Sequence, residues 1–561
     1  MPQRKWFVQR TNPEYIKYLS QSTGISPALA QILINRGIKT PESVKQFLSP
    51  DINHLIDPFD IKGIKEAVDI LKDAIKDGRR ILVHGDYDTD GLTATAIVVE
   101  SLRSLGAELE YFIPDRFVDG YGFSNGGLQH ALNTGTSLIL TVDCGITSFD
   151  AIKKAKSKGI TVIVTDHHEP KRDSSGVSIL PEADVIVNPR LDPEAPVMSG
   201  AMVAFKLCEG LLGRGEARRL LDLAALGSIA DIIPLVDECR IVVKEGLSLI
   251  NSFERKGIKA LAEVSGLRAG NINAGVLSFT LIPRINASGR IDHARDVIQL
   301  LLTDDYDEAV SIAERLHDLN LKRQRIEEDV LSQAMEDVQH RGYDFAIVCA
   351  SEGWHEGVVG IVAARLVERF YRPAFVFNID GDIAKGSARS IPPLDLYECI
   401  SRCSDLLISF GGHKQAAGLK LPVDRLTEFE ERINIIISEM LTDEDLIPTL
   451  TIDAAVRLKE VSFRLIQELQ KLEPYGAGNP EPLLGTKALE VLNPRIVGNN
   501  HLKMLLKDNS VVMDAIGFDM AERFEMLQNG RIDAVYCPSI NEWEGGRFLQ
   551  LRLRTFRASE N

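Results

Sequence analysis

The 561-residue sequence lacks several features that define special classes of protein. No apolar run approaches the roughly 18–20 residues that span a bilayer, so we expect no membrane segment. The N-terminal segment MPQRKWFVQR has no apolar core of the kind found in signal peptides, and we therefore expect a cytoplasmic protein. The seven cysteines are scattered and form no CxxC pair, which argues against a disulfide framework and against a structural zinc site.

Positive charge is also scarce. The chain has 64 Lys and Arg residues against 80 Asp and Glu residues, which gives a net charge of −16. Because phosphate binding needs positive surface, this balance argues against a protein that coats nucleic acid tightly and without sequence preference. It does not exclude an acidic enzyme that lines one groove with basic side chains. The length implies about three to five domains.

Short β-rich runs alternate with amphipathic helical patterns between about residues 65 and 235. The runs are RRILVHG (79–85), ELEYFI (108–113), SLILTV (137–142), ITVIVT (160–165) and DVIVN (184–188). Alternation at this spacing predicts βαβ units and a doubly wound parallel sheet, which we assign to a domain over residues 61–303. Residues 1–60 are predicted to form a helical lead-in.

The rest of the chain predicts three further parts. Residues 304–340 contain no Gly or Pro and keep a helical apolar stripe, which indicates a long connector helix over 304–342. A smaller α/β domain is expected over 343–445. Several short β-rich runs with turn signals follow in 446–561 and predict a small β-barrel or sandwich.

Acidic and imidazole side chains follow three of the predicted strands. They are His84, Asp86, Asp88 and Asp90 after the first run, Asp143 after the third, and Asp166, His167 and His168 after the fourth. In an open α/β sheet the ligand crevice lies beyond the carboxyl ends of the strands, so these side chains should converge. Asp231 lies in the apolar segment ALGSIADIIPL, where a lone carboxylate is costly unless it is paired or bound to metal.

A single acid after a strand is usually a helix cap or a turn residue. Three such strand ends together favour a metal site instead. Carboxylate and imidazole ligands without thiolates suit Mn²⁺ or Mg²⁺. Because one ion needs fewer ligands than these, we expect two ions about 3.5–4 Å apart, the arrangement that clamps both reacting oxygens in phosphoryl transfer. The sequence thus predicts a two-metal hydrolase of phosphate esters.

Several motifs resemble a known superfamily. HGDYDTDG, DCG, TDHH and ALGSIADIIPL resemble the four ordered motifs of the DHH phosphoesterases, and GGHKQAAG (411–418) resembles their companion DHHA1 domain. Further segments resemble the RecJ family of bacterial 5′ exonucleases specific for single strands, over about residues 60–555. These are IPDRFVDGYG (113–122), PRINASGRI (283–291), WHEGVVGIVAARLVERFYRP (354–373), GSARS (386–390) and PYGAGNPEP (474–482).

The resemblance implies roles for the residues of the predicted metal site. One ion would be held by His84, Asp88 and Asp143, and the other by Asp90, Asp143, His167 and Asp231, with Asp143 bridging. His168 would face the scissile phosphate, and Asp166 would orient its neighbours through hydrogen bonds. The role of Asp86 stays open between a ligand, an acid that orients water and an outer partner of the ligands.

The resemblance also implies phosphate-binding residues, which would recognise the 5′ end. The candidates are Arg116, Arg290, Ser387, Arg389 and His413. Arginine is suited to this task because its planar fork pairs with phosphate in bidentate fashion. Each arginine also has an ordinary alternative, such as an ion pair between Arg290 and Asp292. Tyr121 is expected to stack on a base.

The C-terminal β-region is expected to be an OB-type barrel, a fold that binds single strands through basic and aromatic side chains. Lys503, Lys507, Arg547, Arg552, Arg554 and Arg557 are available, although a solvated outer face would explain them equally well. No recognition-helix or zinc-finger pattern is present, so sequence-specific readout is not expected.

These expectations combine into one functional hypothesis and two alternatives. The hypothesis is a monomeric 5′→3′ exonuclease that hydrolyses single-stranded DNA to nucleotides in recombination and repair, with a single-strand-binding protein and a helicase as partners. Another enzyme on the same core, such as a pyrophosphatase, an oligoribonuclease or a cyclic-dinucleotide phosphodiesterase, is the first alternative. A replication scaffold without metals is the second. Whether RNA is also cut stays open.

Overall fold

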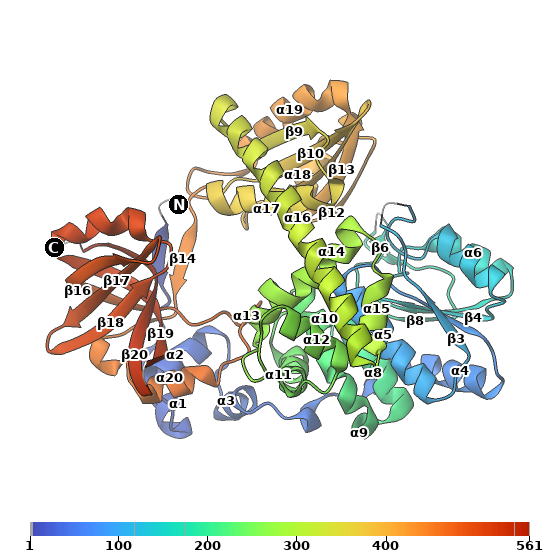
Figure 1. Ribbon diagram of the computed structural model, residues 1–561, viewed down its shortest axis with the longest axis horizontal. Helices are drawn as coiled ribbons and strands as arrows, with labels where there is room; N and C mark the ends of the chain where they lie inside the picture. Colours follow the sequence, from blue (N-terminus) through green and yellow to red (C-terminus); the bar gives the residue numbers. More distant parts are fainter. Residues whose placement is uncertain (1–3, 117, 174, 544, 560–561) are drawn as a thin grey trace. The chain divides into compact units, whose positions relative to one another are not determined.

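The computed structural model of the chain describes residues 4–116, 118–173, 175–543 and 545–559. Its first α/β region contains a parallel sheet with the strand order β3-β2-β4-β5-β8 (Figure 1). The strands are β2 (Ile81–His84), β3 (Leu109–Phe112), β4 (Leu138–Val142), β5 (Thr161–Thr165) and β8 (Val185–Val187). Each of the five predicted β-runs contains one of them, and the predicted doubly wound parallel sheet is confirmed.

Helices cover both faces of this sheet. Leu82, Ile139 and Val162 belong to the apolar cluster that the sheet shares with α6 (Asn125–Asn133) and α7 (Phe149–Ser157). The other face contacts α5 (Thr89–Ser104) and α8 (Gly200–Leu212), and α4 (Ile64–Lys76) packs on α8. Buried apolar residues on both sides explain why the strands are almost continuously hydrophobic.

A largely helical region follows the sheet. Its helices are α9 (Arg214–Ala217), α10 (Leu221–Ala230), α11 (Asp237–Ser252), α12 (Lys256–Val264), α13 (Ala274–Val276), α14 (Ile282–Ile291) and α15 (Arg295–Leu302). Helix α10 packs against α5, α8 and α11, which buries its apolar residues on all sides. A π-helical turn, Leu277–Leu281, separates α13 from α14. A short hairpin, β6 (Lys171–Arg172) and β7 (Ser178–Ile179), projects from the sheet region.

The long helix α16 (Tyr306–Arg341) lies within the predicted connector range and leads to the second α/β region. That region has a mixed sheet with the strand order β12-β13-β11-β10-β9. Its elements are β9 (Ile347–Glu352), α17 (Glu356–Phe370), β10 (Ala374–Asp380), β11 (Ile383–Arg389), α18 (Leu396–Ser401), β12 (Ser409–His413), β13 (Ala416–Pro422) and α19 (Leu426–Met440). Only β9 and β10 pair in parallel; the other described neighbours are antiparallel.

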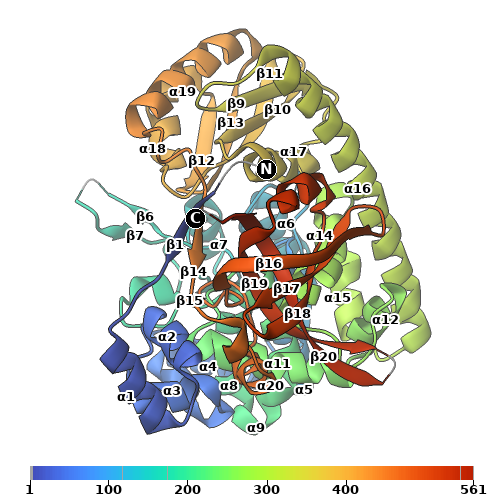
Figure 2. The same cartoon turned by 90° about the vertical axis from the view of Figure 1, so that its left-hand side faces the viewer.

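The C-terminal region is a closed five-stranded barrel, as expected for an OB-type fold (Figure 2). Strands β16 (Leu484–Val497), β17 (His501–Asp508), β18 (Val511–Gly517), β20 (Gly546–Ala558) and β19 (Arg531–Trp543) pair in that order, and β19 closes onto β16. The connecting segment contains β14 (Thr449–Ile452), β15 (Ala454–Ala455) and α20 (Phe463–Gln470).

The N-terminal residues form β1 (Lys5–Val8), which pairs with β14, and three helices. Helices α1 (Pro13–Thr23), α2 (Pro27–Asn35) and α3 (Pro41–Leu48) each begin with proline, directly after the capping residues Asn12, Ser26 and Thr40. Proline suits this position because its missing N–H would have no partner inside the helix. The three helices share one apolar cluster with the barrel, so the predicted lead-in packs on the other end of the chain.

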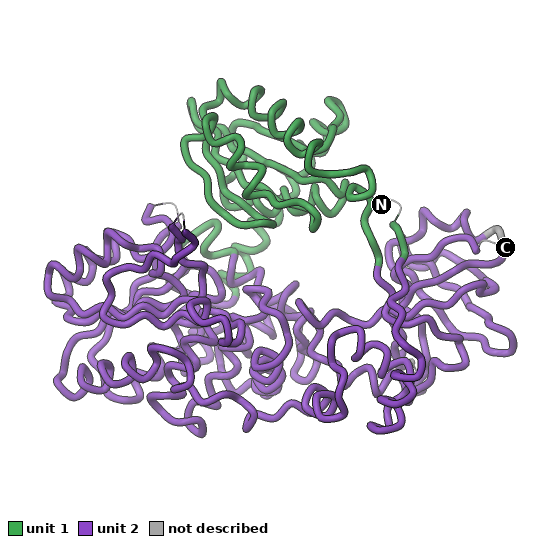
Figure 3. Tube along the Cα trace, turned by 180° about the vertical axis from the view of Figure 1, so that it is seen from behind, with its two compact units in different colours: residues 1–6, 287–293, 314–450 green, residues 7–286, 294–313, 451–561 purple. Residues whose placement is uncertain are grey.

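The chain divides into two compact units (Figure 3). Residues 7–286, 294–313 and 451–561 form the larger unit, which contains the first α/β region and the barrel. Residues 1–6, 287–293 and 314–450 form the smaller one, which contains the second α/β region. Within the described residues, no helix combines the length and the apolar composition needed to cross a membrane.

Candidate metal centre

The predicted metal ligands lie where the strand order of the parallel sheet reverses. Strand β3 pairs with one side of β2, and β4 and then β5 extend the other side. His84 is the last residue of β2, Asp143 follows β4, and Asp166 begins the segment after β5. Because the three strands are neighbours and parallel, their carboxyl ends meet at one edge, which is the usual ligand site of such sheets.

The structure brings together side chains that are far apart in the sequence. His167 Nε2 lies 3.1 Å from Asp143 Oδ1, 3.7 Å from Asp90 Oδ2 and 3.7 Å from Asp231 Oδ2. Asp90 comes from the first turn of α5, and Asp231 directly follows α10. One donor atom each from Asp90, His167 and Asp231 lies within 4.8 Å of the others, a spacing that one cation could fill.

A second group of donors adjoins the first. Asp86, Asp88 and Asp143 each offer a carboxylate oxygen, and these oxygens also lie within 4.8 Å of one another. Asp143 therefore contributes to the second group and also contacts His167 of the first. Its backbone has a φ of 60°, an unusual conformation for a residue other than glycine. Asp143 is therefore placed to serve both groups.

Buried polar atoms at this edge lack partners. His84 is fully buried, its ring packs against Phe112 and Phe123, and its Nε2 has no hydrogen-bond partner among the described residues. Asp86 Oδ1 is in the same situation. A buried polar atom without a partner costs about 1–3 kcal/mol, so such atoms call for a ligand. Divalent cations bound by carboxylate and imidazole fit this donor set.

The backbone groups that hold Asp90 were not predicted from the sequence. The N–H of Gly200 donates to Asp90 Oδ2 at 2.6 Å, and the N–H of Ala201 donates to Asp90 Oδ1 at 3.0 Å. Both belong to the first turn of α8, where free N–H groups and the helix dipole attract a carboxylate. Ser199 caps α8, but nothing in the sequence shows that the N-terminus of this helix holds Asp90.

Glycines line the site because larger residues would not fit. A Cβ atom on Gly200 would lie 2.2 Å from Asp143 Oδ1, and one on Gly227 would lie 2.5 Å from Asp90 Oδ1. A Cβ atom on Gly127 of α6 would lie 2.6 Å from His84 Nε2. These three glycines were not predicted as site residues, since a glycine inside a helix pattern does not reveal what approaches it.

The three consecutive residues after β5 have different surroundings. Asp166 is fully buried and accepts hydrogen bonds from the N–H groups of Ile146, His167 and His168 and from the His168 ring, 2.8 Å away. Burial opposes ionisation of Asp166, but these hydrogen bonds and the charge of His168 outweigh it and lower the pKa of the carboxyl. Burial likewise lowers the pKa of His168, but Asp166 more than compensates and raises it to about 9.

His84, His167, Asp90 and Asp143 favour the uncharged form when no cation is present. Burial lowers the pKa of His84 and that of His167 to about 4, so both imidazoles are neutral and able to bind metal. Burial, and then the neighbouring Asp231, raises the pKa of Asp90 to about 8. Burial, and then Asp90, raises the pKa of Asp143 well above its usual range. Crowded buried carboxylates of this kind need positive charge to ionise together.

Two predicted substrate-binding residues lie close to this centre. The Tyr121 hydroxyl is 2.9 Å from His168 Nδ1, and the two rings meet edge to face. The Arg116 guanidinium lies over the ring of Tyr87, between Asp86 and Asp88 in the chain, 5.4 Å from its centroid. The tyrosine was predicted to stack on a base; its hydroxyl contact to His168 was not foreseen.

The remaining predicted substrate-binding residues lie in the smaller unit. Arg389 donates to Ser387 Oγ at 3.1 Å, and the two side chains approach Gly360 of α17. Arg389 on β11 and His413 on β12 both pair with Ala416 of β13, so they lie at the same end of the sheet. Arg290 donates to the carbonyl of Gly357 at 3.1 Å.

Comparisons with known proteins agree across the chain. Residues 80–228 match the DHH family, N-terminal domain, residues 342–439 match the DHHA1 domain, and residues 452–555 match the RecJ OB domain. The chain is 40% identical over 566 residues to the single-stranded-DNA-specific exonuclease RecJ of Bacillus subtilis strain 168, which covers 99% of this chain and 71% of that protein. It is 35% identical over 560 residues to the Escherichia coli K12 exonuclease RecJ, covering 94% and 95%.

A solved structure agrees with these relatives. The crystal structure of RecJ in complex with Mn²⁺ from Thermus thermophilus superposes with a TM-score of 0.86 at 32% identity. The superposition covers 99% of this chain and 80% of that one.

Proposed function

The chain belongs to the RecJ family of DHH phosphoesterases, and from that premise we propose that it is a 5′→3′ exonuclease that hydrolyses single-stranded DNA to nucleotides. The observation on which this depends is the convergence of acids and imidazoles at one edge of the parallel sheet. Relatives at 35–40% identity over nearly the whole chain are single-stranded-DNA-specific exonucleases by name. The closed barrel supports a strand-binding role, since OB folds commonly bind single strands.

Two divalent cations, Mn²⁺ or Mg²⁺, are part of this proposal. His84, Asp88 and Asp143 would hold one, and Asp90, Asp143, His167 and Asp231 the other. A carboxylate oxygen of Asp86 lies within 4.8 Å of oxygens of Asp88 and Asp143. This spacing favours a role for Asp86 as a metal ligand or as a direct neighbour of the ligands. When bound, the cations would activate water and offset the charge that develops on the phosphate.

The chain itself would supply a cationic hydrogen-bond donor. In the metal-free fold, Asp166 holds the His168 ring through Nδ1 and raises its pKa to about 9, which would leave the Nε2–H edge to donate to a phosphate oxygen. A charge-assisted hydrogen bond of this kind stabilises the developing negative charge. Tyr121, next to the same Nδ1, would restrict the motion of the imidazole.

The 5′→3′ direction of degradation would be set by residues of the smaller unit. Ser387 positions Arg389, and His413 lies at the same sheet end, so this set could bind a terminal 5′ phosphate. Arg290 and Arg116 are the other arginines that would bind phosphates of the substrate. A role in recombination and repair, with a single-strand-binding protein and a helicase supplying the substrate, completes the proposal.

A degradation assay on end-labelled single strands in Mn²⁺ tests the proposal. We expect label to be released first from the 5′ end, and Asp143→Asn to abolish release, because that acid serves both donor groups. Gly210→Ala, a change in α8 whose new Cβ would have apolar side-chain atoms as its three nearest neighbours, is the control that should retain activity. Release first from the 3′ end would refute the polarity. Higher activity on pyrophosphate or a dinucleotide than on long strands would favour another enzyme of the superfamily.

A further inference from the structure

The segment PRINASGRI (283–291) contains more than the predicted phosphate ligand Arg290. It forms most of α14, and the chain reaches it through the π-helical turn Leu277–Leu281. A π-turn takes an extra residue and so rotates everything after it about the helix axis, which means that the helical period does not show which side chains of α14 face a neighbour. Such turns are frequent at functional sites.

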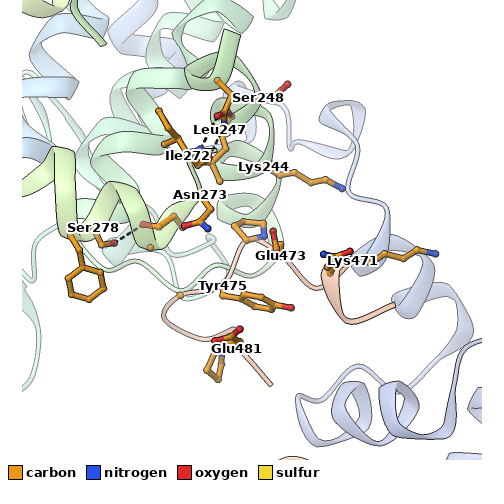
Figure 4. A pocket seen from close by; sticks show the side chains of 18 of the residues that line it. Lys244, Leu247, Ser248, Ile272, Asn273, Ser278, Lys471, Glu473, Tyr475 and Glu481 are labelled. Atoms are coloured by element: carbon orange, nitrogen blue, oxygen red, sulfur yellow. Dashed lines mark hydrogen bonds between the residues drawn. The ribbon is translucent and has the colours of Figure 1, made fainter. Parts of the chain in front are cut away.

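The residues that precede α14 are held in the wall of a pocket of about 940 Å³ (Figure 4). Ser278 of the π-turn donates to the carbonyl of Ala274 at 3.0 Å. Asn251 of α11 bonds to both backbone groups of Ile272, accepting from the N–H at 3.0 Å and donating to the carbonyl at 2.7 Å. With its start anchored in this way, α14 is a firm support for a side chain that holds another segment.

Asn286 of α14 holds the first residue of α5, which lies 197 residues earlier in the chain. Its Oδ1 accepts from the Thr89 N–H at 3.0 Å and from the Thr89 hydroxyl at 2.8 Å. Because a backbone N–H can only donate, the oxygen of the Asn286 amide, and not its nitrogen, must face Thr89. Thr89 is 1% exposed, and the first N–H groups of a helix have no partner within it, so Asn286 supplies the acceptor that this buried N–H needs.

Thr89 separates two of the predicted metal ligands. Asp88, directly before it, belongs to one of the two donor groups, and Asp90, directly after it, belongs to the other. A shift of the backbone at Thr89 would therefore move both carboxylates. The contact with Asn286 lies at the point in the chain where the two donor groups meet.

The two acids depend on this contact to different degrees. Asp90 is 2% exposed and is held independently by N–H groups at the start of α8. Asp88 is exposed, and within the described part of the chain its carboxylate accepts one hydrogen bond, from the Gly91 N–H at 3.1 Å. Since Gly91 belongs to the first turn of α5, this bond ties Asp88 only to the start of that helix, and Asn286 in turn holds the helix start.

We propose that Asn286 is a positioning residue of the metal centre. By holding Thr89 it keeps the carboxylate of Asp88 close to those of Asp86 and Asp143, and it thereby maintains the cation site to which Asp88 contributes. The inference rests on the proposed two-cation centre. The alternative is an ordinary structural role, in which Asn286 stabilises the start of α5 without any effect on the cations.

The test is calorimetric titration of the metal-free full chain with Mn²⁺, together with thermal unfolding in EDTA. Wild type should bind two ions. Asn286→Ala should weaken the binding of one ion by about 10–100-fold, the usual effect of disturbing the outer partners of metal ligands. The other ion should bind as before, because Asp90 keeps its support from α8. Asn286→Asp retains an oxygen acceptor for both donors of Thr89 and should restore the lost affinity.

Asn434→Ala, in α19 of the smaller unit, is the matched control. The Oδ1 of Asn434 also accepts two hydrogen bonds, from the N–H groups of Phe345 at 3.0 Å and Ala346 at 2.8 Å. Its loss should lower the Tm in EDTA about as much as Asn286→Ala does, but should leave Mn²⁺ binding unchanged. If both variants lower the Tm and neither weakens Mn²⁺ binding, Asn286 is a structural residue and the inference is wrong.

A double-mutant cycle assigns the effect to the contact itself. Thr89→Val removes the hydroxyl donor but keeps the backbone N–H, so it should weaken the same ion less than Asn286→Ala does. The double variant should bind that ion no more weakly than Asn286→Ala alone, because the hydroxyl then has no acceptor to lose. Fully additive losses would mean that the two side chains act separately, which would overturn the inference.

The outcomes separate the positioning role from the proposed function. If wild type binds two ions and degrades single strands while Asn286→Ala binds both ions normally, the inference is wrong and the exonuclease stands. If Asn286→Ala loses affinity for one ion but wild type releases no nucleotide in Mn²⁺, the positioning role stands and the proposed activity is wrong. If wild type binds fewer than two ions, the two-cation centre and the inference fail together.

Discussion

Replacing Gly200 with alanine should damage the metal centre while leaving the helix around it intact. A Cβ atom at this position would lie 2.2 Å from Asp143 Oδ1 and 2.4 Å from Asp143 Cγ, far inside van der Waals contact. Asp143 has little room to yield, because it is 2% exposed and its backbone is held at a φ of 60°. Gly200 also donates its N–H to Asp90, so any shift of α8 disturbs that acid too.

Two opposing terms set the magnitude of this effect. Alanine is favoured over glycine within a helix by about 1 kcal/mol. Overpacking a rigid interior costs about 1–3 kcal/mol, so the free energy of unfolding should fall by no more than about 2 kcal/mol. The affinity for Mn²⁺ should also fall, by about 10–100-fold, since disturbing even the outer partners of a metal ligand has that effect.

Titration of the metal-free protein with Mn²⁺, followed by calorimetry, measures the affinity, and urea unfolding in EDTA measures the stability. Gly210→Ala is the matched control, because Gly210 lies in the same helix and the three atoms nearest to its new Cβ belong to the apolar side chains of Val68, Phe59 and Ile64. We expect weaker Mn²⁺ binding in the first variant and none of that loss in the second. Unchanged Mn²⁺ affinity in Gly200→Ala would refute the placement of Asp143 against α8.

Three further predictions concern charge and buried hydrogen bonds. The pKa of Asp90 is raised to about 8 in the metal-free fold, so ionising this acid destabilises that fold as pH rises from about 4 through 8. The increase in Tm on adding Mn²⁺ should therefore grow between pH 5 and pH 8. An increase that stays constant over this range would contradict the prediction. Asp166→Asn should lower the pKa of His168 from about 9 to below 7 in an NMR titration, since burial by itself lowers the pKa of this imidazole. A value still near 9 would show that Asp166 does not cause the raised pKa. Arg240→Met should reduce the free energy of unfolding, measured by urea denaturation, by about 3 kcal/mol or more, because several buried carbonyls lose their hydrogen-bond donor. A smaller loss would mean that water replaces the guanidinium.

The sequence was informative wherever function depends on the residue that ends a strand. His84, Asp143 and His167 could be grouped in advance because parallel neighbouring strands bring their carboxyl ends to one edge. The barrel and the two α/β regions were also predictable, since strand spacing and turn signals are local properties. Asp231 was recognised by a different signal, a lone acid in an apolar segment.

Contacts between distant segments could not be predicted in this way. Nothing in the local pattern of α8 indicates that its N-terminus holds Asp90, about 110 residues earlier in the chain. The ion pairs of Glu481 with β20 and the four carbonyl contacts of Arg240 are likewise long-range, and the helical or strand period does not encode them. Such contacts depend on the relative placement of whole elements, which is fixed only when the apolar faces pack together.

The convergence of acids and imidazoles on a pair of cations is most directly tested by anomalous diffraction from crystals grown with Mn²⁺. We expect two manganese peaks about 3.5–4 Å apart at the carboxyl edge of β2, β4 and β5, both in contact with Asp143. A single peak, or peaks that do not contact Asp143 and His167, would contradict the two-metal centre.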